Sequence, residues 1–206
     1  MAQAQEHALT ADALQMEREW TLPDRGTVGV IFLIITETVL FSMFVAAYLI
    51  YIGKSLTGPY PKDVLELPIF ASICLLSSSG TIVFAEHALK KGEMGKFKIW
   101  WLVTIVLGLY FLYATGSEWY KLIYEDHLTI STNLFGSTFY SLVGLHASHV
   151  IVGMTFLLVV FFTTLRGFPI QTQERRVKFL SWYWHFVDWV WVIVFTVVYV
   201  LPLKVF

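Results

Sequence analysis

Hydrophobic residues in this chain gather in long runs and do not alternate with polar residues. A helix that crosses a lipid bilayer needs about 20 mostly apolar residues, and five runs reach this length. The fourth run exceeds what a bilayer requires, so we expect its helix to tilt or to project beyond the lipid. The runs predict membrane-spanning helices at residues 27–52, 66–89, 97–120, 133–165 and 177–201.

The connections between the runs are short and rich in turn-forming residues, as in GPYP at 58–61 and KG at 91–92. They leave no room for a soluble domain. We therefore predict an all-α, polytopic membrane protein whose five transmembrane helices form a bundle over residues 27–206. Residues 1–26 are polar and acidic and lack the pattern of a signal peptide, so we expect a tail outside the bilayer.

The overall composition supports this fold class. Only 14% of the residues are charged, whereas a soluble domain has about 25%. The net charge of −1 does not favour a nucleic-acid partner. The single cysteine, Cys74, lies in an apolar run and excludes both a disulfide framework and a cysteine-pair metal motif.

Positive charges are distributed unequally between the two sides of the predicted bundle. Ten of the 14 Lys and Arg residues lie in the tail, in the second connection and in the fourth connection. Four lie on the opposite side: Lys54, Lys62, Lys121 and Lys204. Because cytoplasmic loops carry the excess of positive charge, we predict a cytoplasmic N-terminus and a C-terminus outside.

Small residues recur at helical spacing in three of the runs. In lipid, such stripes indicate where helices approach one another closely. The first run has Thr38, Ser42 and Ala46, the third has Thr104, Gly108, Phe111, Thr115 and Glu118, and the fourth has Ser137, Ser141, Gly144 and Ser148. We predict that these stripes are helix-contact faces.

Glu37 lies about ten residues into the first run, which is about 15 Å along a helix and near the bilayer centre. A bare carboxylate is costly at that depth, so the side chain must be neutral or paired. One interpretation is a neutral acid hydrogen-bonded to another helix. The other is proton or lipid-headgroup chemistry.

Two histidines, His146 and His149, share one face of the fourth run at spacing i, i+3. They could hold a metal or a haem only with further ligands, for which His87, His185 or a carboxylate are candidates. Alternatively, they form hydrogen bonds that dock the fourth helix against the first and fifth. We hypothesise that Glu37 bonds to one of the two.

Residues 182–191 read WYWHFVDWVW and place His185 and Asp188 one helical turn apart. This segment is either an interfacial aromatic belt with one polar pair or part of a functional site, because ionisable groups in a membrane helix are costly. We expect His185 and Asp188 to face the bundle and Trp182 and Trp184 to lie at the interface. The chain has no phosphate loop and no nucleophile motif, and its histidines do not make a complete ligand set on their own.

Several segments resemble subunit III of the haem–copper terminal oxidases, particularly cytochrome c oxidase. They are IITETVLFSMF at 34–44, LELP at 65–68, AEHAL at 85–89, GSEWY at 116–120, FGSTFY at 135–140, GLHASHV at 144–150 and WYWHFVDWVW at 182–191. They occur in the family's order over residues 27–201. The pattern is similar to the five-helix bacterial form, and the family's GxHGxH appears here as GLHASH.

The resemblance implies a non-redox core subunit of a proton-pumping oxygen reductase in aerobic respiration, located in the bacterial cytoplasmic membrane. Haems and copper would belong to partner subunits, and no residue of this chain would be catalytic or bind a cofactor or a metal. This chain would pack against subunit I, assemble with subunit II and other oxidase subunits, bind phospholipids and support proton uptake. Glu37 matches the family's buried carboxyl, Glu118 its glutamate closing the third helix, and His146, His149, His185 and Asp188 its intramembrane polar cluster.

Two alternatives remain open at this point. The first is subunit III of a quinol oxidase, which would have the same fold. The second is a stand-alone membrane protein that binds haem or metal through His146 and His149.

Overall fold

A computed structural model describes residues 24–167 and 170–202 of the chain. The chain divides into two compact units, Met1–Leu33 and Ile34–Phe206. In the first unit, the described residues begin helix α2 (Arg25–Tyr51). The expected N-terminal tail, residues 1–26, lies almost entirely outside the described residues.

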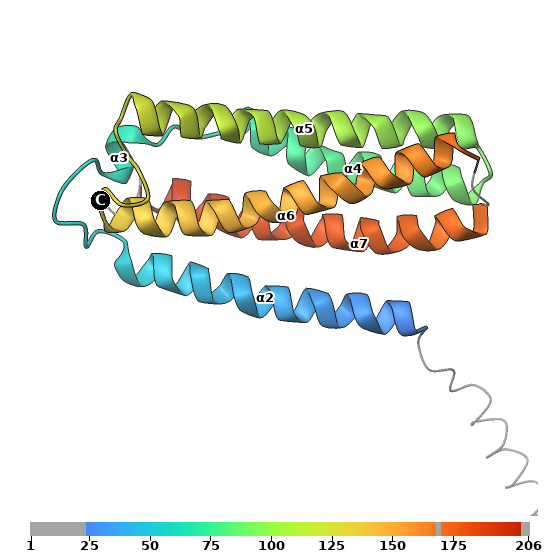
Figure 1. Cartoon of the computed structure of the whole chain (residues 1–206), viewed down its shortest axis with the longest axis horizontal. Coiled ribbons are helices and arrows are strands. Elements are labelled where there is room, and N and C mark those ends of the chain that lie inside the picture. Colours follow the sequence, from blue (N-terminus) through green and yellow to red (C-terminus); the bar gives the residue numbers. More distant parts are fainter. Residues whose placement is uncertain (1–23, 168–169, 203–206) are drawn as a thin grey trace, which may run out of the picture. The chain divides into compact units, whose positions relative to one another are not determined.

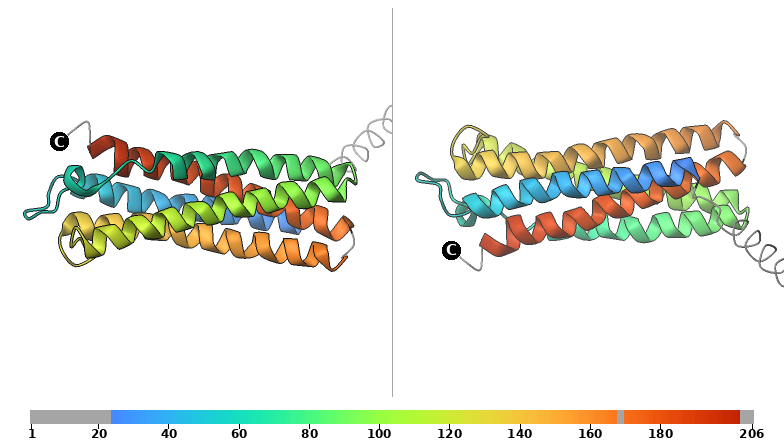
Figure 2. Two further views of the ribbon diagram at one scale, coloured as in Figure 1. Left: turned by 90° about the horizontal axis from the view of Figure 1, so that it is seen from above. Right: turned by 90° about the horizontal axis from the view of Figure 1, so that it is seen from below.

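The second unit consists of long helices joined by short connections (Figures 1 and 2). After α2 come the short helix α3 (Pro61–Val64) and then α4 (Ile69–Lys90), α5 (Met94–Tyr124), α6 (Leu134–Leu165) and α7 (Ile170–Phe195). A π-helical turn, η1 (Thr196–Val200), continues α7. Within residues 24–167 and 170–202, five helices, α2 included, are long and apolar enough to cross a membrane. This confirms the predicted all-α membrane class.

Helices α4, α5, α6 and α7 form a closed ring, because each packs against two of the others: α4 on α5, α5 on α6, α6 on α7 and α7 on α4. From Ile34 onward, α2 lies outside this ring. It contacts α6 and α7 through Phe41, whose ring lies near those of His149 and Phe186. Phe41 and Tyr48 are the only buried residues among the described side chains of α2.

The helix ends differ from the apolar runs for identifiable reasons. Helix α4 begins at Ile69, three residues after the start of the predicted run at residue 66. Pro68 is its N-cap, and a proline disfavours helical backbone in the residue before it. Helix α5 extends beyond its run at both ends, and α7 begins at Ile170, well before residue 177. An apolar run predicts only the part of a helix that lies in lipid. Helices α5 and α7 are longer than their runs because polar residues at their ends are also helical.

Three fully buried tryptophans connect the ring through their indole N–H groups. Trp101 on α5 donates to the Leu157 carbonyl on α6 at 3.0 Å. On α7, Trp184 donates to Ser78 Oγ at 2.8 Å, and Trp191 donates to Ser72 Oγ at 3.0 Å. A buried indole usually finds such a partner, and here the partners lie on neighbouring helices.

Glycines on α5 and α6 make room for the Trp184 ring. A Cβ atom added at Gly153 would lie 2.9 Å from two ring carbons of Trp184, and one added at Gly108 would lie 3.1 Å from another. Neither position can hold a larger side chain unless its surroundings move. Gly108 belongs to the predicted stripe of the third run, whose Thr104, Phe111 and Thr115 are also buried, so this contact face is confirmed.

The other two predicted stripes differ from the expectation. On α6, Gly144 faces Trp119, but Ser148 is exposed and donates to the Leu145 carbonyl of its own helix. On α2, the predicted face is uncovered. Thr38, Ser42 and Ala46 line an apolar groove of about 260 Å³. Val190 and Ile193 of α7 form part of the same groove.

The connection between α2 and α4 is held to the start of α6 at one end of the second unit. Asn133 caps α6 by accepting a hydrogen bond from the Gly136 N–H at 2.8 Å. Its amide nitrogen donates to the carbonyls of Thr57 and Pro59, each at 3.0 Å. One side chain therefore both starts a helix and fixes the neighbouring loop.

We predict that Gly153→Ala destabilises the protein, because its new Cβ would overlap the Trp184 ring and overpacking costs about 1–3 kcal/mol. Thermal unfolding of the detergent-purified chain, followed by tryptophan fluorescence, measures the effect. Gly80→Ala on α4 is the matched control, since nothing lies within 4 Å of its added Cβ. Equal unfolding midpoints for the two variants would contradict the packing described.

Candidate functional site

Ser79 on α4 connects the two polar residues of the tryptophan-rich segment. Its hydroxyl donates to Asp188 Oδ2 and lies 2.9 Å from His185 Nδ1. Because a hydroxyl has one hydrogen, Ser79 then accepts from an N–H at Nδ1 of His185. The prediction that His185 and Asp188 face the bundle is confirmed, but they are linked through a third residue on another helix.

This arrangement is buried and incompletely satisfied. Asp188 is 3% exposed, and its Oδ1 has no hydrogen-bond partner within the described residues. Sequence reasoning missed Ser79. The signal was present, because residues 77–79 are three successive serines in an apolar helix. Two of them have partners on α7, since Ser78 accepts from Trp184 and Ser79 bonds to Asp188.

Glu37 on α2 is hydrogen-bonded to His149 on α6. Glu37 Oε2 lies 2.9 Å from His149 Nε2, and His149 Nδ1 lies 2.8 Å from the carbonyl oxygen of Leu145. The predicted contact between Glu37 and a histidine of the fourth helix is therefore confirmed, with His149 as the partner. The α6–α7 contact also involves this residue, because the Tyr183 hydroxyl donates to the His149 carbonyl at 3.1 Å.

The geometry fixes the proton count of the pair. A carbonyl oxygen can only accept, so Nδ1 of His149 carries a hydrogen in every protonation state that keeps this bond. The contact between Nε2 and Oε2 then needs one further proton, which resides either on Glu37 or on the imidazole. The pair is uncharged overall in both forms, which suits a site inside a membrane.

His146 lies apart from these groups in an aromatic environment. Its ring stacks on Trp191 at a centroid distance of 5.0 Å and meets the edge of Phe111 at 5.9 Å. It is fully buried, and neither ring nitrogen has a hydrogen-bond partner in the described part of the chain. His146 thus docks α6 against α7 by ring packing, and it does not converge with His149 on a common ligand.

Glu118 and His87 occupy separate places. Glu118 Oε2 accepts from the hydroxyl of buried Tyr199 at 3.0 Å, whereas its Oε1 is buried without a partner among the described residues. His87 is exposed, and its Nδ1 lies 3.0 Å from the Val83 carbonyl of its own helix. Across residues 24–167 and 170–202, no three His, Cys, Asp or Glu side chains come close enough to hold a metal ion.

The expectation for the tryptophans needs one correction. Trp184 was predicted at the membrane interface but is fully buried in the ring. Trp182 is partly exposed, and the Lys178 ammonium lies 5.0 Å from its ring centroid. Aromatic content does not distinguish the two positions. Trp184 lies one turn before Asp188 on the core face of α7, and Trp182 does not.

Comparison with known proteins shows what this bundle is similar to. The family model for cytochrome c oxidase subunit III matches residues 13–202. The chain is 36% identical over 188 residues to cytochrome c oxidase subunit 3 of Alkalihalophilus pseudofirmus, covering 87% of this chain and 91% of that protein. The corresponding protein of Bacillus sp. PS3 is 35% identical over 167 residues, which is 80% of each chain.

A mammalian relative, cytochrome c oxidase subunit 3 of Damaliscus lunatus, is 38% identical over 143 residues. This match covers 69% of the chain but only 53% of that relative. The chain therefore spans about half the length of the mammalian protein that it matches.

Five apolar helices with paired polar groups between them define a multi-pass helical membrane protein. The chain belongs to the cytochrome c oxidase subunit III family, as the sequence motifs predicted. It is a subunit of an oxygen-reducing oxidase complex, and so it assembles with other oxidase subunits. The names of its relatives favour cytochrome c oxidase over the quinol-oxidase alternative.

We predict that Ser79→Ala destabilises the protein by about 1–3 kcal/mol, because it removes the partner of a buried carboxyl oxygen. Ser77→Ala is the matched control, since Ser77 lies two residues before Ser79 on the same helix and is exposed. Ser79→Thr should restore most of the loss by returning the hydroxyl. Thermal unfolding in detergent measures all three, and an Ser79→Ala variant as stable as Ser77→Ala would contradict the bridging role.

Proposed function

We propose that this chain is the five-helix subunit III of a bacterial, proton-pumping aerobic oxidase that takes electrons from cytochrome c. It carries no haem or copper and supports the catalytic subunit, proton uptake and the binding of structural phospholipids. The observation that carries the proposal is the family match over residues 13–202. Residues 1–26 form the cytoplasmic tail, and residues 27–206 form the membrane bundle.

The uncovered face of α2 supports direct packing against another subunit. Thr38, Ser42 and Ala46 are exposed. The large apolar side chains of Val39, Met43 and Ile50 are each more than half exposed. Helix α2 therefore buries little against the rest of the second unit. Within a multi-subunit membrane complex, such a face contacts a neighbouring helix or lipid. We propose subunit I as the neighbour, with phospholipid in the remaining grooves.

The Glu37–His149 pair supports a role in proton uptake. The pair holds one proton that can reside on either partner without a change in overall charge. Because the pair stays uncharged in both forms, it avoids the cost of a bare charge inside a membrane. His146, His185, Asp188 and Glu118 would shape the surrounding polar interior, and none of them is proposed as a ligand.

The charge distribution supports an orientation in the bacterial cytoplasmic membrane. The α4–α5 connection and the C-terminal end of α6 lie at the same end of the second unit (Figure 1). Basic residues lie near both, including Lys90, Lys91, Arg166 and Arg176. We propose that this end is cytoplasmic. The N-terminus is then cytoplasmic and the C-terminus outside.

Purification of the tagged chain in mild detergent tests the proposed function. We expect haem-containing chains to co-purify with it, and we expect the complex to oxidise reduced cytochrome c. Isolation of the chain as a single coloured protein would favour the stand-alone alternative. Oxidation of quinol without oxidation of cytochrome c would favour the quinol oxidase.

We predict different effects for two substitutions of Glu37. Glu37→Gln keeps a donor for His149 Nε2 but cannot release a proton from it, so it should slow proton uptake or shorten catalytic life at unchanged thermal stability. Glu37→Ala should in addition lower the stability by about 1 kcal/mol, because it leaves the imidazole without its partner. Proton uptake and turnover number of the purified complex measure the effects.

Glu125→Gln is the control for the Glu37 variants, since Glu125 is exposed at the end of α5. Haem content should be unchanged in every variant. Loss of haem from Glu37→Ala would indicate a ligand role, and normal proton uptake by Glu37→Gln would contradict the proton-holding role.

A further inference from the structure

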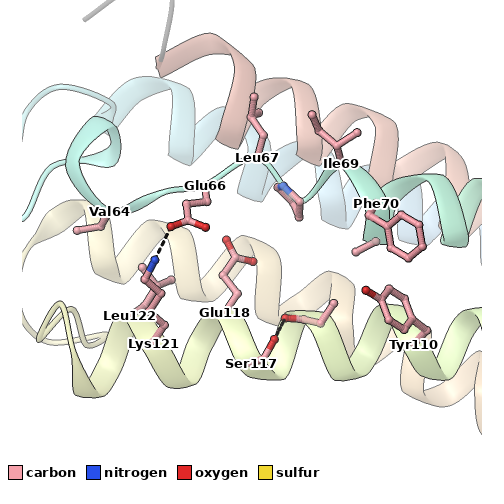
Figure 3. A pocket seen from close by; sticks show the side chains of 13 residues that line it. Val64, Glu66, Leu67, Ile69, Phe70, Tyr110, Ser117, Glu118, Lys121 and Leu122 are labelled. Carbon is pink, nitrogen blue, oxygen red and sulfur yellow. Dashed lines mark hydrogen bonds and ion pairs between the residues drawn. The ribbon is translucent and has the colours of Figure 1, made fainter.

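A groove lies between the start of α4 and the C-terminal half of α5 (Figure 3), and neither Glu37 nor His149 lines it. Its volume is about 320 Å³. On α5 it extends from Tyr110 to Leu122, which is about 18 Å along the helix axis. Residues 66–68, which lead into α4, form its other edge. We call it the α4–α5 groove.

The two ends of the α4–α5 groove differ in polarity. One end contains Glu66, Glu118 and Lys121, and the Lys121 ammonium donates to Glu66 Oε1. At the other end, the rings of Phe70 and Tyr110 meet edge to face at 5.3 Å, and both are exposed. Figure 3 shows the charged groups together at one end and the rings at the other.

The charged end has unused hydrogen-bonding capacity of both kinds. The hydrogen bond from Lys121 and its positive charge lower the pKa of Glu66, which is therefore ionised at neutral pH. Lys121 has three N–H donors, and Glu66 takes one of them. The Glu118 carboxyl lines the groove, and its buried Oε1 has no partner in the described part of the chain.

A ligand that matches this end needs an N–H cation for the two carboxyl groups and an adjacent anion for Lys121. A ligand that also matches the ring end needs an apolar chain. We propose that the α4–α5 groove binds an aminophospholipid, with its primary ammonium at Glu66 and Glu118, its phosphate at Lys121 and an acyl chain along Phe70 and Tyr110. This inference rests on the proposed lipid-binding role and specifies its site and headgroup.

The same contacts discriminate against other phospholipids. A choline headgroup has a cation without N–H donors, so it cannot hydrogen-bond to Glu118 Oε1. A glycerol headgroup brings a phosphate without a cation to a site that has two carboxyl groups and one ammonium. The aminophospholipid alone among these three presents both charges together with three N–H donors.

Native mass spectrometry of the purified oxidase complex tests the proposal. The complex is delipidated and then incubated separately with phosphatidylethanolamine, phosphatidylcholine and phosphatidylglycerol. We expect one phosphatidylethanolamine molecule to be retained in preference to the other two lipids. Lys121→Gln should weaken this retention about tenfold, because a hydrogen bond to a charged group is lost. Glu118→Gln should reduce the preference over phosphatidylcholine.

Glu125→Gln is the matched control, since it removes a charge at the same end of α5 but does not line the groove. Equal retention of the three lipids, or unchanged retention in Lys121→Gln, would overturn the proposal. Displacement by soluble phosphoethanolamine at the same concentration would show that the ring end contributes nothing and would overturn it as well. The haem spectrum and subunit content of each variant complex separate these outcomes from a failure of the proposed function.

Discussion

The contact between Trp184 and the glycines opposite it is the packing constraint on which the ring depends. An indole is large, and the four helices can close around it only because Gly153 and Gly108 have no side chains. The indole N–H is satisfied by Ser78 on α4. One residue of α7 therefore fixes its distance to α6 and α5 and its register against α4. Lipid supplies no hydrophobic force between helices, so close packing and interhelical hydrogen bonds must provide this specificity.

The register set by Trp184 also positions the polar groups. Ser78 and Ser79 are adjacent on α4, and their partners Trp184 and Asp188 are one turn apart on α7. A shift of α7 by one residue would break both hydrogen bonds at once. The buried carboxyl of Asp188 is thus tolerated because an apolar contact next to it holds its partner in place.

The intramembrane polar residues form separate pairs, and this separation is informative for function. Glu37 is paired with His149, Asp188 with Ser79 and His185, and Glu118 with Tyr199. No hydrogen bond given by the described residues joins these groups into one site. Such an arrangement is consistent with the proposed supporting role, in which the redox chemistry takes place in a neighbouring chain.

The sequence by itself determined the fold class, the five helices and the family, because the length and hydropathy of a membrane helix are local properties and the motifs occur in order. It also identified the ionisable residues inside the membrane. It did not determine their partners. Ser79, the choice of His149 over His146 for Glu37, and the burial of Trp184 depend on which helix faces which. Only the tertiary structure decides this, because residues with the same helical periodicity can face lipid, core or groove until the neighbouring helices are in place.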